Sequence, residues 1–334
     1  MSSTRLAALL LAIVAVVVVA LVVGPGALDP WRAAAALGRG LFGPHDPRDV
    51  DLALVWTLRL PRVLLVALVG AALASSGALT QGLFRNPLAD PSVLGVSLGA
   101  ALVAVIGLFL GLDRAGIWVT PVLAATGAAA TLGILWWLAS RGHDGTTLLL
   151  AGVAIAAACG AATSSVLALA GDRPELGVRV IRWLMGSFEG RSWGHLGAAV
   201  IPIVAGVALA VAMARDLDGL LLGDEIAASL GVELATLRRG AIAAVAILIG
   251  TATAMCGVIG FVGLVVPHVV RRWLGSSHHG LVVGSALVGA LLLMIIDTLG
   301  RAADLPLPPG VVTSLLGAPA FLWILLRTGA RRAA

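Results

Sequence analysis

Long apolar runs separated by short polar segments dominate the pattern of this chain. A helix that crosses the hydrocarbon core of a bilayer needs about 20 predominantly apolar residues. Ten segments approach or reach that length, so we predict ten membrane-spanning helices with both chain ends on the same side. The expected spans are residues 6–24, 62–82, 92–111, 117–139, 147–170, 195–214, 240–257, 260–274, 281–300 and 312–328.

Two points of this topology stay open. The segment 260–274 is short and contains Pro267, so it is either a short span or a re-entrant element. Arginine falls evenly on the two sides of the ten-span arrangement, so the excess of basic residues that marks cytoplasmic loops does not orient the chain.

Composition agrees with several membrane spans, because 60% of the residues are hydrophobic and 12% are charged. A soluble domain carries about 25% charged residues. All 22 basic residues are arginine, and an ATP-binding P-loop needs a lysine on the phosphates. If this chain takes part in an ATP-driven process, another chain therefore hydrolyses the ATP. The arginines are scattered, which disfavours a nucleic-acid partner.

Charged residues at the predicted span ends allow two interpretations. Arg59, Arg62 and Arg301 lie at one end, where arginine either reaches to the membrane surface or binds carboxylates of a partner. Asp297 lies inside an apolar run, and an ionisable group there is a functional candidate by default. Arg301 follows it by one helical turn, so an internal ion pair is the favoured interpretation.

Two further features concern helix geometry. Residues 85–91 contain Pro87 and Pro91, which exclude helix for the residues before them, so a hinge is predicted. A stripe of small residues at steps of four predicts either a close helix contact or a smooth wall of a wide path. It consists of Gly152, Ala156, Gly160 and Ser164.

The polar segment 215–239 contains a predicted short helix. Acidic Asp224 and Glu225 suit a helix N-terminus, and Gly231 suits a helix end. Ile226 and Leu230 give it an apolar face, as in helices that bind a groove on a partner. Two histidines, His278 and His279, are expected in a solvated loop, and no set of side chains with metal-ligand spacing is found.

Several blocks together resemble the FecCD family, the permeases of ATP-driven importers for iron chelates, haem and vitamin B12. They are residues 59–100, HDGTTLLLAG at 143–152, GVIGFVGLVVPHVVR at 257–271, DTLGR at 297–301 and VVTSLLGAPAFLWILL at 311–326. The run 305–310 departs from the family pattern by added prolines. The resemblance implies one all-α transmembrane permease domain over residues 1–334, with the type II importer fold and ten transmembrane helices per protomer.

The resemblance also implies roles for particular residues. Arg59, Arg62 and Arg301 would receive a substrate-binding protein, and the helix near 222–232 would couple the chain to its ATPase. The implied coupling residues are Gly223, Asp224, Glu225, Ala228, Leu230 and Gly231. The implied cytoplasmic gate is Asn86 and Leu88 with Gly145 and Thr146. The small residues Gly152, Ala156, Gly160 and Ser164 would line the path.

The expected function is that of a homodimeric permease in the bacterial inner membrane, without an ATPase site or a cofactor of its own. ATP and magnesium would bind two partner ATPase subunits, and a periplasmic or lipid-anchored binding protein would deliver the substrate. An iron chelate, either a siderophore complex or haem, is the first expectation and vitamin B12 the second. An ion-coupled transporter would need buried carboxylates near the midplane, and a membrane enzyme would need a converging catalytic set; neither is favoured.

Overall fold

The computed structural model describes residues 3–24, 26, 28–43, 48–116, 118–169, 171, 174–303 and 307–330. Most of these residues are helical, and no strand occurs among them. Each of the ten predicted apolar segments coincides with one long helix. These helices are α1 (Ser3–Val22), α4 (Leu60–Leu83), α5 (Val96–Phe109), α6 (Val119–Ser140), α7 (Gly145–Leu169), α9 (Trp193–Ala212), α12 (Leu234–Cys256), α13 (Val262–Leu274), α14 (His278–Ala302) and α15 (Pro309–Ala330).

Seven of the described helical segments are long and apolar enough to cross a membrane. They are α1, α6, α7, α9, α12, α14 and the continuous helix Val50–Leu83, which joins α3 and α4. The apolar helices α5 and Pro309–Leu322 of α15 are shorter, and α13 has 13 residues. The membrane-protein class and the all-helical fold are therefore confirmed, whereas the count of ten spans stays a prediction.

Short helices occupy the polar segments between the long ones. They are α2 (Pro30–Phe42), α3 (Val50–Leu52), the π-helical turn η1 (Ala53–Arg59), the 3₁₀ turns η2 (Pro91–Leu94) and η3 (Leu112–Ala115), α8 (Pro174–Leu184), α10 (Ala214–Leu220) and α11 (Asp224–Ser229). The predicted short helix in segment 215–239 is thus present as α11. The amphipathic α8 lies in the polar segment between α7 and α9.

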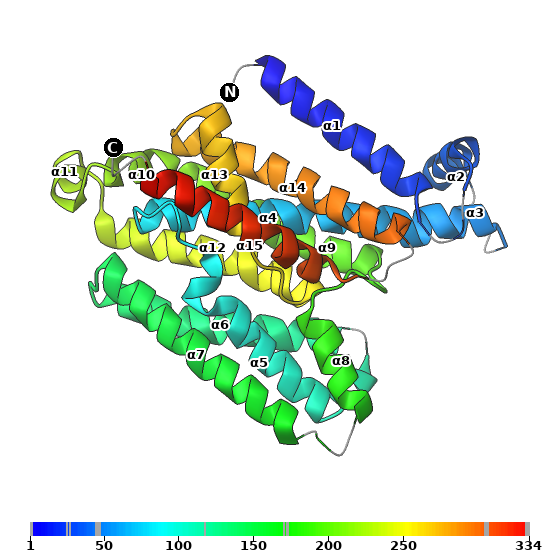
Figure 1. Ribbon diagram of the computed structural model, residues 1–334, viewed down its shortest axis with the longest axis horizontal. Coiled ribbons are helices and arrows are strands. Elements are labelled where there is room, and N and C mark those ends of the chain that lie inside the picture. The colour runs from blue at the N-terminus through cyan, green and yellow to red at the C-terminus, as the bar shows by residue number, and fades with distance from the viewer. Residues whose placement is uncertain are drawn as a thin grey trace.

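Helix α4 lies at the centre of the bundle and contacts α14, α12, α13 and α9 (Figure 1). In the apolar stretch of the helix Val50–Leu83, 78% of the residues are buried, against 11% in that of α7, which lies at the periphery. Small residues permit the central packing, because a Cβ on Gly70 would collide with the Gly289 carbonyl of α14. A Cβ on Gly77 would likewise collide with the Gly263 carbonyl of α13. Close backbone approach of this kind is the usual way helices associate in lipid.

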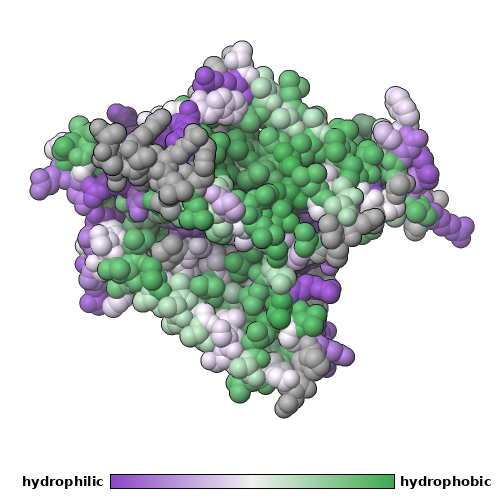
Figure 2. All heavy atoms as spheres, viewed as in Figure 1, coloured by the Kyte–Doolittle hydropathy of each residue, from purple (hydrophilic) through white to green (hydrophobic). Residues whose placement is uncertain are grey.

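The long helices place the polar elements at two opposite ends of the molecule. Helices α2, α3 and α8 lie at one end, here named the outer end, and α10 and α11 lie at the other, the inner end (Figure 1). The start of α1 is tied to the inner end, since Arg5 Nη1 donates to the Trp273 carbonyl at 2.9 Å. Figure 2 shows apolar side chains over most of the middle of one face, with hydrophilic ones mainly toward the two ends.

Candidate functional sites at the two ends of the bundle

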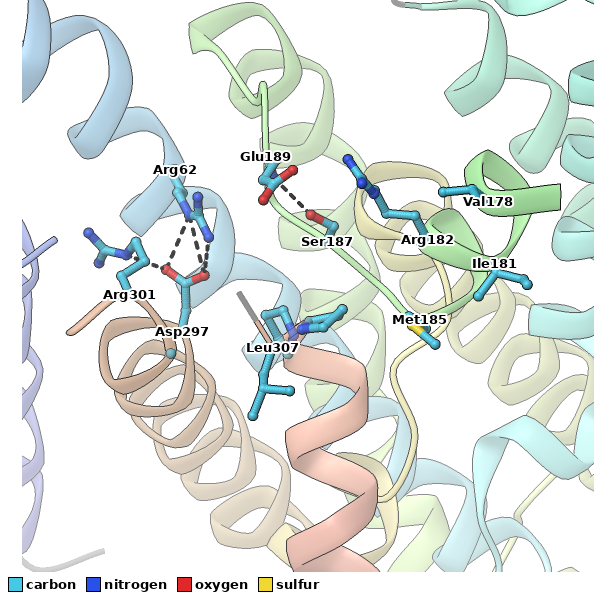
Figure 3. Close-up of a pocket in the computed structure, with 13 residues that line it drawn as sticks. Arg62, Val178, Ile181, Arg182, Met185, Ser187, Glu189, Asp297, Arg301 and Leu307 are labelled. Carbon is cyan, nitrogen blue, oxygen red and sulfur yellow. Dashed lines mark hydrogen bonds and ion pairs between the residues drawn. The ribbon is translucent and has the colours of Figure 1, made fainter. Parts of the chain in front are cut away.

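At the outer end, Asp297 of α14 lies between two arginines (Figure 3). Arg301 Nε is 3.1 Å from Asp297 Oδ2, and Arg62 Nη2 of α4 is 2.7 Å from Oδ1. The Asp297 side chain is 2% exposed, and a carboxylate this buried is tolerated only when it is paired. The predicted pair of Asp297 with Arg301 is therefore confirmed. Arg62, 235 residues away in the sequence, completes it.

Arg59 and Arg301 also hold the end of α1. Arg59 donates to the carbonyls of Leu21, Val22 and Gly26 at 2.7–2.8 Å, and Arg301 Nη1 donates to those of Ala20 and Val23 at 3.1 and 2.9 Å. The last carbonyls of a helix have no partner within the helix, and a positive charge is favourable there. Together the two guanidinium groups cap this helix end.

This geometry bears on the docking role expected for Arg59. Arg59 is 5% exposed and its guanidinium binds carbonyls at the end of α1, so it is not presented at the surface of this chain, and its docking role stays a prediction. The turn η1 extends the helix before α4 and places Arg59 beside α1. Arg301 is also largely buried, with 10% of its side chain exposed, against 21% for Arg62.

Arg62, Asp297 and Arg301 form one wall of an open cavity of about 660 Å³ at the outer end. Figure 3 shows Arg182, Ser187 and Glu189 across from them. The sequence interpretation did not single out Arg182 or Glu189, although it placed a polar segment there. The lining residues are Arg62, Val178, Ile181, Arg182, Met185, Ser187, Glu189, Asp297, Gly300, Arg301, Leu307, Pro308 and Pro309.

At the inner end, the hinge after α4 adopts the geometry that its two prolines predict. Arg85 has a positive φ of 49°, and the Asn86 side chain accepts a hydrogen bond from the Leu88 amide at 3.0 Å. Asp90 accepts one from the Ser92 amide at 2.7 Å, which starts η2. Burial raises the pKa of the Asp90 carboxyl, although its bonds from Ser92 act in the opposite direction.

The hinge lies against the start of α7. A small cavity of about 120 Å³ is lined by Asn86 on one side and by Gly145 and Thr146 on the other, so the structure brings three of the four expected gate residues together. Leu88 does not line it. Asp144 Oδ1 accepts a hydrogen bond from the Thr147 amide at 3.0 Å and so caps α7. Hydrogen bonds from Thr147 lower the pKa of Asp144 below its ordinary value.

Helix α11 projects from the inner end (Figure 1), and two of its apolar residues are exposed. Ile226 is 49% and Leu230 is 64% exposed, while Ala227 is buried. Gly223 and Gly231 flank the helix with φ values of 107° and 86°, which glycine adopts without a steric penalty. The expected end of the helix near Gly231 is confirmed.

The small-residue stripe of α7 divides into two parts. Gly152 and Ala156 pack against the turn before α5, where a Cβ on Gly95 would lie 3.0 Å from the Gly152 carbonyl oxygen. A Cβ on Gly160 would have no atom within 4 Å, and Ser164 is exposed. Close helix contact therefore accounts for the first pair, and the second pair faces open space in this chain.

Comparisons with known proteins agree on one family. The model of the FecCD transport family matches residues 9–327. The chain belongs to the FecCD transport family. Among curated relatives, the hemin transport system permease protein of Yersinia pestis is 45% identical, with 83% of this chain and 85% of the relative covered. The Fe(3+) dicitrate transport system permease protein of Escherichia coli is 43% identical, with coverages of 89% and 91%.

Two further matches extend the range of relatives. The cobalamin import system permease protein of Halobacterium salinarum is 42% identical, with 85% of this chain and 75% of the relative covered. A solved structure described as an inward-facing conformation of a putative metal-chelate type ABC transporter superposes with a TM-score of 0.85. Its sequence is 29% identical, and the match covers 97% of this FecCD chain and 99% of the solved one.

The inner end of this FecCD permease also contains a histidine–aspartate contact that the sequence interpretation missed. His278, expected in a solvated loop, is 1% exposed at the start of α14, and its Nδ1 lies 2.6 Å from Asp218 Oδ1 of α10. No sequence signal joins these residues, which are 60 positions apart. Within the described ranges, no group of His, Cys, Asp and Glu side chains is arranged to hold a metal ion.

Proposed function

We propose that this chain is the membrane-spanning permease subunit of an ATP-driven importer, and that it moves an iron chelate inward across the bacterial inner membrane. Two copies would enclose a central path between them. The proposal rests on the 45% identity to a hemin permease together with the meeting of hinge, α7 start and α11 at one end of the bundle.

Energy for transport would come from two partner ATPase subunits. The sequence contains no lysine and hence no ordinary P-loop. The exposed side chains of Ile226 and Leu230 on α11 suit a helix that binds a groove of such a partner. Nucleotide and binding protein would each favour one conformation of the permease and so shift its population between outward-open and inward-open states.

Gate and path residues follow from the same proposal. Asn86 and Leu88 of the hinge would open and close against Gly145 and Thr146 at the cytoplasmic side. Gly160 and Ser164, which face open space, would line the path, and Gly152 and Ala156, which pack against the turn before α5, would border it.

Haem or a ferric siderophore is the proposed cargo, and cobalamin is the second candidate because a cobalamin permease is 42% identical. The decisive experiment reconstitutes the chain with its ATPase and binding protein in liposomes. Uptake of labelled haemin, a labelled ferric siderophore and labelled cobalamin is then measured with ATP on the side of the membrane that carries the ATPase subunits. Vesicles without ATP are the control. ATP hydrolysis without uptake of any of the three would contradict the importer function.

Docking of the binding protein is proposed at the outer cavity, through Arg62 and, where conformational change exposes it, Arg301. Acidic side chains of the partner would bind these guanidinium groups. Arg62→Gln should weaken binding-protein affinity, whereas Arg59→Gln should leave the affinity of the folded fraction unchanged because Arg59 is buried. Equal affinity losses in both variants would contradict this assignment.

An ion-coupled transporter is the alternative from another class. Its candidate carboxylate, Asp297, has both oxygens bound by arginines, which disfavours an ion or proton site. Uptake that persists in liposomes containing the permease alone, driven by an ion gradient, would favour that alternative.

A further inference from the structure

Four charged residues of alternating sign lie together at the inner end. Asp224 Oδ2 is 2.6 Å from Arg238 Nη2, and Asp224 Oδ1 is 3.4 Å from Arg85 Nη2. Arg238 also acts electrostatically on Asp144, as a smaller contribution than the Thr147 hydrogen bonds. Arg85, Asp144, Asp224 and Arg238 all line the same small cavity as the gate residues.

Each member of this cluster belongs to a different element. Arg85 lies in the hinge directly before Asn86, Asp224 begins α11, Arg238 lies in the first turns of α12, and Asp144 caps α7. Asp224 is therefore the one residue through which α11 contacts both the hinge and α12 by ion pairs among the described side chains. A displacement of α11 would reach the hinge by this route.

The two contacts of Asp224 differ in quality. The bond to Arg238 is short, and the Arg238 side chain is 13% exposed. Asp224 Oδ1, in contrast, is buried without a hydrogen-bond partner, and its contact with Arg85 lies outside hydrogen-bond geometry. Charge-assisted N–H···O bonds are about 2.7–2.9 Å long, so a shift of roughly half an ångström would complete this one. Arg238 is thus the fixed partner, and Arg85 the adjustable one.

The backbone at Arg85 adds a second reason to regard this contact as adjustable. Its φ of 49° lies in the left-handed region that non-glycine residues rarely occupy. Such a conformation persists only where the surroundings impose it. The Arg85 amide donates to the Gly82 carbonyl at 3.1 Å, and its guanidinium lies toward Gly223 and Asp224. A change at Asp224 would therefore alter the forces that hold the hinge.

We infer that Asp224 is a positioning residue, which transmits movement of α11 to the gate hinge through its adjustable ion pair with Arg85 while Arg238 anchors it to α12. The inference rests on the proposed function, because it takes α11 as the contact of the ATPase and Asn86 and Leu88 as gate residues. It adds the side chains that carry the movement between them.

The test measures how nucleotide alters the exposure of the hinge. Leu88→Cys, in a chain that also carries Cys159→Ala, is labelled with a maleimide in the complete complex with the ATPase. Cys256 is retained, because it is 2% exposed and is not accessible to the maleimide. The labelling rate is compared without nucleotide and with ATP and vanadate. Asp224→Asn, which preserves shape, should reduce this nucleotide-dependent difference at least about fivefold, the lower end of usual coupling between sites.

Matched variants separate positioning from other effects. Asp216→Asn removes the same charge from an exposed residue of neighbouring α10, one for which no ion pair is found among the described side chains, and should retain the full difference. Arg85→Gln should reproduce the loss, and Arg85→Gln with Asp224→Asn should be no worse than either alone, since coupled residues are not additive. Each variant is also tested for co-purification of the ATPase.

The outcomes distinguish the two proposals. An unchanged difference in Asp224→Asn, additive losses in the double variant, or loss of the ATPase from Asp224→Asn would each overturn the positioning role. A parent complex that binds no ATPase would overturn the proposed function and, with it, the link.

Discussion

The two ends of the molecule use the same chemistry, an aspartate between two arginines, in opposite ways. At the outer end, Asp297 is 2% exposed, and its shortest contact with each arginine is 3.1 Å or less. At the inner end, Asp224 is 37% exposed, with one contact of 2.6 Å and one of 3.4 Å. The outer arrangement fixes α4, α14 and α1 together. The inner one leaves a contact that can tighten or break, which suits an end that moves.

The largest expected effect is at the buried outer pair. Asp297→Ala leaves Arg62 and Arg301 facing each other without a counter-charge, and breaking a buried pair costs about 3–5 kcal/mol. We expect a marked fall in the unfolding temperature of the purified protein in detergent. Asp216→Ala, at an exposed aspartate, should show almost none. If both variants unfold at the same temperature as the wild type, the outer end is not fixed by this pair.

The next effect concerns the cap on α1. Arg59→Ala removes donors from four carbonyls. Carbonyls at a helix end can bond to water instead, so we expect a loss close to that of a single hydrogen bond to a charged group, about 1.5–3 kcal/mol. We expect faster hydrogen exchange and proteolysis around residues 20–26, with the inner end unaffected. Arg114→Ala, an exposed arginine at the same end, is the control. Unchanged protection in Arg59→Ala would show that the capping bonds contribute nothing measurable.

A smaller effect on stability is expected at the inner aspartate. Asp224→Asn should cost less than about 1 kcal/mol, because partly exposed ion pairs contribute little. Its effect on hinge exposure should nevertheless exceed that of Asp297→Asn. Thermal unfolding of both variants under identical conditions tests this, and an equal loss of stability would remove the contrast between the two ends.

The smallest effect is the pH dependence of the α7 cap. Hydrogen bonds from Thr147 depress the pKa of Asp144 in the folded state from its usual value of 3.8. Its contribution is therefore present above that value and is lost only as the pH falls below it. Between about pH 5 and 8, protection of the first turn of α7 should stay constant in the wild type. Asp144→Asn should keep most of this protection, and Asp144→Ala should keep less. A change in the protection of the wild type between about pH 5 and 8 would contradict a lowered pKa of Asp144.

Much of the fold follows from local patterns. The ten apolar runs coincide with ten helices because a run of about 20 apolar residues has few alternatives to a buried or lipid-facing helix. Pro87 and Pro91 locate the hinge, since proline restricts the residue before it. Asp224 and Gly231 bracket α11 for equally local reasons, a favourable charge at the start and a permissive backbone at the end.

The sites were only partly predictable. Asp297 with Arg301 was found because the two residues lie one turn apart on a single helix, where spacing fixes distance. Arg62 was placed at the correct end, but its bond to Asp297 was not predicted. The burial of Arg59 against α1 was also missed, because no pattern tells which way a span-end arginine turns. His278 appeared solvated in the sequence for the same reason: its partner, Asp218, lies on another element.

The sequence by itself determined where the helices, the hinge and the short helix α11 lie, and that the chain contains no lysine and hence no ordinary P-loop. These properties depend on neighbours within a few residues. Only the tertiary structure decided that Arg59 caps α1, that Arg62 completes the pair at Asp297, and that Asp224 lies between Arg238 of α12 and Arg85 of the hinge. Each of these contacts joins residues on separate elements, and distances across a folded bundle are set by the packing of whole helices, which no local spacing records.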